Sequence, residues 1–255
     1  MSRFAKRAFN MTPAGSLFRK AANLGKVGAS LFKKGTPVGT DKSARFSSGT
    51  YIIGESGKTD EAIKKTNDLI KDTGYEVAPK LSNRQITTYK DNEGNFNISH
   101  RGTCFSCPNK IKDVISDVAL AVGINTKQSK NRLKRTEEII DRIKMNNPNA
   151  KINMSGHSLG GHTSSYAIAN SKKIRDNVNK LNTYNAGATP LIKNRGLQIS
   201  ADVKKELDKK VEHHRKAGDA ISGGLLVNNP FGKVSTYKAS SVNTLKEHGL
   251  ENFYK

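Results

Sequence analysis

The sequence predicts an α/β fold, with a mostly parallel central sheet covered by helices on both faces. Segments with helical periodicity alternate with short apolar strands along most of the chain, which is the pattern of such sheets. The length of 255 residues fits one domain of this class. Apolar residues make up 35% of the chain, enough for one core plus solvated appendages.

The expected elements begin with a helix over residues 60–72. Two antiparallel strands follow at 85–90 and 96–101, joined by a glycine-containing turn. The remaining elements are helices at 109–122 and 131–146, a strand at 152–155, a helix at 161–171, and strands at 181–185, 210–214 and 233–239. The residues Asn147-Pro148-Asn149 end the helix that precedes the strand at 152–155.

Positive charge dominates the chain, most strongly at its N-terminus. Forty-four Lys and Arg residues oppose 22 Asp and Glu, and the formal net charge of +22 attracts polyanions such as anionic lipid surfaces or nucleic acid. Residues 1–40 hold eight basic residues and no acidic one, and Leu17, Leu24 and Leu31 fall on one helical face. This segment fits a basic amphipathic membrane-surface helix, a targeting peptide or a disordered tail, and all three interpretations stay open.

We predict a basic N-terminal segment over residues 1–45 and a folded domain over residues 46–255, with the Ser-, Gly- and Thr-rich residues 35–50 as a linker. The chain has no unbroken run of 18 apolar residues and no secretory signal, so we expect no transmembrane helix. Cys104 and Cys107 are too few for a disulfide scaffold or a zinc site. An intracellular or membrane-peripheral location is the default, and packaging in a virus particle or delivery to a target membrane also fits. The oligomeric state is left open.

The motif Gly156-His157-Ser158-Leu159-Gly160 lies between a predicted strand and a predicted helix. A nucleophilic serine needs a tight strand-to-helix turn that exposes its hydroxyl. Glycines two residues before and after the serine remove side chains that would clash in that turn. The start of the next helix adds a partial positive charge near developing negative charge. The motif therefore predicts a nucleophile elbow of the α/β-hydrolase type, with Ser158 as the nucleophile.

A serine nucleophile needs a general base and a carboxylate that orients the base, in the chain order Ser, acid, His for this fold. His248 follows the last predicted strand, where a loop can bring its imidazole to the serine. Asp219 follows a glycine after the strand at 210–214, and we predict it as the acid. His213 and His214 fall inside that strand, which favours one buried and one solvated ring over a metal site.

Several ordered blocks of the sequence resemble the class 3 lipase family, which includes the fungal triacylglycerol lipases. They cover about residues 50–255, and they are Ile98–Thr103, Lys112–Val118, Ile152–Gly161, Tyr184–Pro190, Gly218–Ser222 and His248–Tyr254. The resemblance implies an oxyanion hole made by the backbone N–H groups of Thr103 and Leu159, with the Thr103 hydroxyl as an additional donor. It implies a lipase-like catalytic domain that requires no metal or organic cofactor.

Three positions depart from the family pattern, and one of them is the block around Ala186, which lacks the usual aromatic-glycine start and the arginine after proline. In the family a lid helix follows the oxyanion strand, and here the short polar segment 104–110 takes its place. This difference argues against interfacial activation and favours a soluble ester or a phospholipid as the substrate. His100 occupies a strand position that is apolar in the family.

The function that these residues predict is hydrolysis of carboxylic esters of lipids, either triacylglycerol or phospholipid, through an acyl-enzyme on Ser158. The expected partners are the lipid or ester substrate and an anionic membrane surface that residues 1–40 contact. The alternative is a non-enzymatic basic protein on a hydrolase scaffold, which binds membranes or, as a secondary option, nucleic acid.

Overall fold

A computed structural model describes residues 41–103, 126–186, 199–219, 222, 231–239 and 244–254. The predicted helix at 109–122, the two cysteines and the basic residues 1–40 lie outside these ranges. The boundary between the N-terminal segment and the folded domain, set after residue 45, therefore stays a prediction.

Seven strands of the described residues form one mixed sheet, and they lie side by side in the order in which the chain reaches them. The strands are β1 Tyr75–Val77, β2 Ile86–Asp91, β3 Phe96–His100, β4 Ile152–His157, β5 Val178–Tyr184, β6 Val211–Lys216 and β7 Lys233–Tyr237. The first three pair antiparallel, and β3 to β7 pair parallel. The expected mostly parallel α/β sheet is confirmed.

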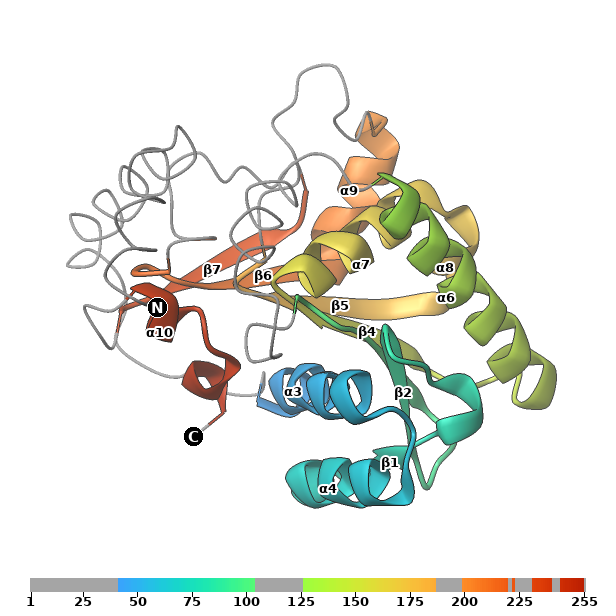
Figure 1. The fold of residues 1–255 in the computed structure, drawn as a ribbon. Helices are drawn as coiled ribbons and strands as arrows, with labels where there is room; N and C mark the ends of the chain where they lie inside the picture. The colour runs from blue at the N-terminus through green and yellow to red at the C-terminus, as the bar shows by residue number, and fades with distance from the viewer. Residues whose placement is uncertain are drawn as a thin grey trace.

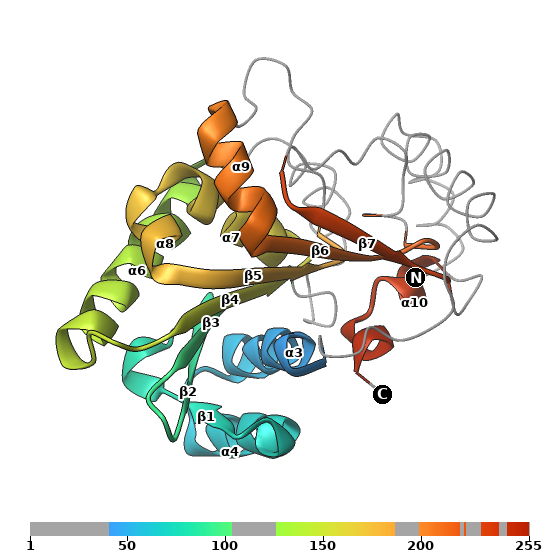
Figure 2. The same cartoon turned by 180° about the vertical axis from the view of Figure 1, so that it is seen from behind.

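Helices cover both faces of this sheet (Figures 1 and 2). One face carries α6 Thr126–Asn146, α7 Leu159–Asn170, α8 Lys172–Asn177 and α9 Ala201–Lys210. The opposite face carries α3 Asp41–Ser56, α4 Asp60–Ile70 and the C-terminal α10 Thr244–Glu247. Short 3-10 turns complete the list of elements, and they are η2 Lys71–Thr73, η3 Pro79–Leu81 and η4 Leu250–Phe253.

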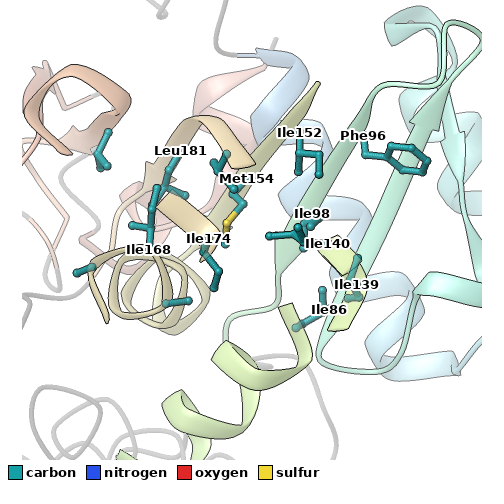
Figure 3. Close-up of a cluster of buried hydrophobic side chains, with 14 of the residues drawn as sticks. Ile86, Phe96, Ile98, Ile139, Ile140, Ile152, Met154, Ile168, Ile174 and Leu181 are labelled. Carbon is teal, nitrogen blue, oxygen red and sulfur yellow. The ribbon is translucent and has the colours of Figure 1, made fainter. Parts of the chain in front are cut away.

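The main apolar core lies between the sheet and the helices α6 to α9 (Figure 3). Ile98 and Met154 point from neighbouring strands toward Ile140 of α6 and Ile168 of α7, and all four are fully or almost fully buried. Burying an aliphatic side chain of this size contributes about 1.5–3 kcal/mol. This core fixes α7 against β4 and β5, and α7 begins directly after the predicted nucleophile.

The predicted linker over residues 35–50 is wrong from residue 41 onward, because helix α3 begins there. The buried face of α3 is made largely of small and hydroxyl-bearing residues, so its apolar periodicity is weak. A Cβ at Gly49 would lie 2.6 Å from the Tyr89 hydroxyl, so glycine lets the helix approach the sheet closely. Thr50 is buried and bonds back to the carbonyl of Ser47, at 2.7 Å. Close packing of small groups stabilises this helix.

In the described ranges, no helix has both the length and the apolar character needed to cross a bilayer.

Candidate active site

The backbone of Ser158 turns sharply between β4 and α7. Its φ of 55° and ψ of −124° lie in a region that L-residues seldom occupy, which is the strain expected at a nucleophile elbow. The Ser158 N–H donates to the carbonyl of Tyr184 at 3.0 Å, and the Ser158 carbonyl accepts from the His162 N–H at 3.1 Å. The turn is therefore tied both to the neighbouring strand and to the first turn of α7.

The two glycines of the motif are required by close backbone contacts. A Cβ on Gly156 would lie 2.5 Å from the carbonyl carbon of Gly160, within the elbow itself. A Cβ on Gly160 would collide with the carbonyl oxygen of His100, at the end of β3. The elbow thus closes on itself and also packs tightly against the strand that leads to Thr103.

His248 and Asp219 form the pair that their sequence positions predict. The Nδ1 of His248 lies 2.8 Å from Oδ1 of Asp219, and both side chains are buried. Asp219 follows the carboxyl end of β6, and His248 directly follows α10. A carboxylate at this distance fixes the imidazole tautomer that carries its proton on Nδ1, which leaves Nε2 as the basic nitrogen.

The second oxygen of the Asp219 carboxylate is held by Ser222. Oδ2 accepts from the Ser222 backbone N–H at 2.7 Å and from the Ser222 hydroxyl. Burial alone would raise the pKa of Asp219, but the facing His248 and the hydrogen bonds from His248 and Ser222 together hold that pKa below its usual value. The carboxylate therefore stays ionised at neutral pH.

Asn185 braces the loop that carries His248. It follows β5 with a positive φ of 42°, and its amide donates to the carbonyls of Glu247 at 2.9 Å and His248 at 3.2 Å. Its Oδ1 accepts from the Lys216 N–H at 2.9 Å and lies 3.2 Å from the Ser222 hydroxyl oxygen. One buried side chain thus connects the loop of the base with the loop of the acid.

His157 supports the same loop from the elbow. Its Nε2 lies 2.7 Å from the carbonyl oxygen of His248, so Nε2 carries the proton and Nδ1 accepts from the Tyr51 hydroxyl, also at 2.7 Å. Burial, with a smaller effect from nearby His248, lowers the pKa of His157 to about 3, so the ring is neutral. The predicted packing or hydrogen-bonding role of His157 matches these contacts.

Thr103 and Leu159, the predicted oxyanion-hole residues, follow β3 and open α7. A Cβ on Gly102 would lie 2.7 Å from the carbonyl of His157, which places the end of β3 against the elbow. The Thr103 hydroxyl is buried and has no hydrogen-bond partner among the described residues. Such an orphaned donor is costly in a folded protein unless a ligand group binds it.

Part of the chain matches a known family. Residues 129–214 match the family described as "Putative serine esterase (DUF676)", and this range includes the whole elbow. Asp219 and His248 lie beyond the matched residues, and their side chains contact each other at 2.8 Å. The match covers about a third of the chain, and over this stretch the chain is similar to serine esterases. The comparison with curated proteins finds no match for this chain.

The chain is also similar to solved structures. The Lip2 lipase from Yarrowia lipolytica has 15% identity and a TM-score of 0.48, with 80% of each chain covered. A mutant form of MDLA from Penicillium cyclopium has 13% identity and a TM-score of 0.45, with 79% of this chain and 80% of that chain covered. Lipase II from Rhizopus niveus has 11% identity and a TM-score of 0.42, with 69% of each chain covered.

Sequence reasoning missed several residues of this candidate site. Tyr51 lies on α3, a helix whose residues 41–50 were expected to be a linker, and Asn185 and Ser222 carry no motif that marks their roles. The expectation of one solvated ring in the His213–His214 pair is also wrong, because both rings are buried. His213 bonds to the Thr183 hydroxyl at 2.7 Å, so this pair belongs to the interior of the sheet.

Proposed function

We propose that the esterase hydrolyses carboxylic esters of lipids through an acyl-enzyme on Ser158. The observation that carries the proposal is the 2.8 Å contact between His248 Nδ1 and Asp219 Oδ1, on the loops that follow the elbow. His248 Nε2 takes the hydroxyl proton as the Ser158 oxygen attacks the ester carbonyl carbon. The same proton then passes to the leaving alkoxide oxygen, and the C–O bond of the ester breaks.

Water completes the cycle by the reverse path. His248 Nε2 removes a proton from water, the hydroxyl oxygen attacks the acyl carbon, and Ser158 leaves with the returned proton. In both steps the carbonyl oxygen becomes an oxyanion, for which the backbone N–H groups of Thr103 and Leu159 are the proposed donors. The buried Thr103 hydroxyl supports a third donor at this place. One such donor contributes about 3–4 kcal/mol to the transition state.

The proposed substrates are acyl esters of lipids, either triacylglycerol or phospholipid. The short polar segment 104–110 at the position of a lid favours substrates that need no large apolar cover, and the net charge of +22 favours an anionic phospholipid surface. The deciding experiment measures hydrolysis of short-chain esters, long-chain esters and a phospholipid, with Ser158→Ala as control. Turnover that persists in Ser158→Ala, or none with any ester in the wild type, would refute the proposal.

We further propose that residues 1–40 bring the esterase to anionic membrane surfaces. Each basic residue near the headgroups contributes about 1 kcal/mol to such binding, and the segment holds eight of them without an acidic residue. Co-sedimentation with anionic vesicles, and little with neutral ones, is the expected result. Equal binding to both would remove the electrostatic argument. Salt-sensitive DNA binding that persists in Ser158→Ala, together with no ester turnover, would instead favour the non-enzymatic alternative.

A further inference from the structure

Arg132 is a buried cation close to the proposed oxyanion hole. The residue is 2% exposed, and the described part of the chain gives its guanidinium no ion pair with a carboxylate. A buried charge without a carboxylate is costly, so its hydrogen bonds need a specific use. One of them runs from Nη1 to the carbonyl of Arg101 at 2.5 Å, two residues before Thr103.

The same guanidinium belongs to a closed ring of hydrogen bonds. Arg132 Nη1 donates to the Thr163 hydroxyl at 3.1 Å, and that hydroxyl lies 3.1 Å from His100 Nδ1. His100 Nε2 lies 2.9 Å from the Thr136 hydroxyl, which donates to the carbonyl of Arg132 at 2.8 Å. All four residues are buried. The ring joins helices α6 and α7 to the end of β3.

The donors and acceptors of these hydrogen bonds match when His100 is neutral. With Nε2 protonated, His100 donates to Thr136 and its Nδ1 accepts from the Thr163 hydroxyl, so every link has one donor and one acceptor. Burial, together with the charge of Arg132, lowers the pKa of His100 well below its usual value, and the imidazole of His100 is therefore neutral. A histidine at this strand position is therefore explained by the arginine beside it.

The ring holds both sides of the proposed oxyanion hole. Thr163 lies one turn after Leu159 in α7, and its hydroxyl also lies 3.2 Å from the carbonyl of Gly160. His100 and Arg101 lead into Thr103, and the carbonyl of Arg101 is held by Arg132. An oxyanion donor stabilises the transition state only when its position is fixed in advance.

We propose that Arg132 is a positioning residue for the oxyanion hole, and that it acts by locking the β3 end that carries Thr103 against the start of α7. This inference rests on the proposed esterase function. It predicts that loss of the guanidinium weakens binding of the transition state and leaves ground-state binding of the ester nearly unchanged.

The test compares Arg132→Met with Arg142→Met, an exposed arginine on the same helix. The readouts are kcat and KM for an acyl ester, affinity for an alkyl boronic acid that mimics the tetrahedral intermediate, and the unfolding midpoint. For Arg132→Met we expect kcat and boronate affinity to fall together by about 10²-fold, with KM changed less than twofold. Arg142→Met is expected to match the wild type in all readouts.

Arg132→Lys and Thr163→Val keep the proposal testable if Arg132→Met does not fold. Lysine restores the charge and one hydrogen bond, so it should recover part of kcat and of boronate affinity, and Thr163→Val should lower both by about tenfold. Variants that are less stable but keep the wild-type kcat and boronate affinity would overturn the inference about Arg132. In that case the proposed function would still stand, because turnover would still depend on Ser158. A wild type without Ser158-dependent turnover would instead refute the function.

Discussion

The Nδ1 of His248, just after α10, lies 2.8 Å from Oδ1 of Asp219, just after β6, and both side chains are buried. The carboxylate is held in turn by two hydrogen bonds from Ser222. Because three groups fix its position, Asp219 can orient the imidazole without moving during the reaction.

Asp219→Asn should remove most of the activity while leaving the fold intact. An amide at this place no longer favours the imidazole tautomer with its proton on Nδ1, and it does not stabilise the imidazolium that forms. We expect kcat to fall by about 10³- to 10⁴-fold with KM changed little. Steady-state kinetics with a short-chain ester measure this. A kcat within tenfold of the wild type would show that another carboxylate orients His248.

Tyr51→Phe should weaken the support of the His248 loop. The tyrosine hydroxyl donates to His157, which donates to the carbonyl of His248, so its loss frees the His157 tautomer. A hydrogen bond of this kind is worth about 1 kcal/mol, and we expect kcat to fall about fivefold. The matched control is Tyr254→Phe, which removes a hydroxyl that accepts from Ser48 on the same helix. Equal kcat in the two variants would show that the hydrogen bonds from Tyr51 through His157 do not support the His248 loop.

Gly160→Ala should disrupt the elbow. The new methyl group would collide with the carbonyl of His100, and backbone on both sides would have to shift. We expect a loss of at least about 2 kcal/mol in the free energy of unfolding, together with loss of activity. Gly74→Ala is the control, since a Cβ there meets nothing within 4 Å and costs only the strain of its left-handed backbone, about 1–2 kcal/mol. Similar activity in both variants would contradict the tight contact.

The buried histidines should make the protein sensitive to acid. Burial lowers the pKa of His157 and His213 to about 3 and of His214 to about 4. In the unfolded chain each histidine titrates near pH 6.5, so below that pH the unfolded state binds more protons and the free energy of unfolding falls. We expect each ring to contribute a loss of about 2 kcal/mol between pH 7 and pH 5.

Urea unfolding at pH 7 and pH 5 measures this loss. The depressed pKa of Asp219 acts in the same direction at lower pH, because its stabilising contribution is present above the unfolded carboxyl pKa and is lost as pH falls through the folded value. A free energy of unfolding that is constant between pH 7 and pH 5 would show that these rings do not remain neutral.

The elbow and the order of acid and histidine could be predicted from the sequence because each depends on local signals. Ser158 lies in a motif whose glycines have a steric purpose, and His248 follows the last strand. Helix α3 could not be predicted, since its buried face is formed by small and hydroxyl-bearing residues such as Ser47 and Thr50.

Residues that act through long-range contacts were also beyond sequence reasoning. Asn185 reaches a carbonyl 63 positions away, and His100 meets Thr163 across the same interval of 63 positions. No local pattern marks such pairs, because the sheet and its covering helices bring them together. The sequence did mark His100 as a departure from the lipase pattern, and its pairing with Thr163 and Thr136 beside Arg132 gives that departure a physical reason.

The proposed function requires Ser158 to be a nucleophile that the His248–Asp219 pair activates. The rate of labelling by a fluorophosphonate, with mass spectrometry of the labelled peptide, tests this requirement. We expect one phosphonate on Ser158 in the wild type, none in Ser158→Ala, and a labelling rate at least about 10³-fold lower in His248→Asn. Labelling of a different residue, or an unchanged rate in His248→Asn, would show that Ser158 is not activated in this way.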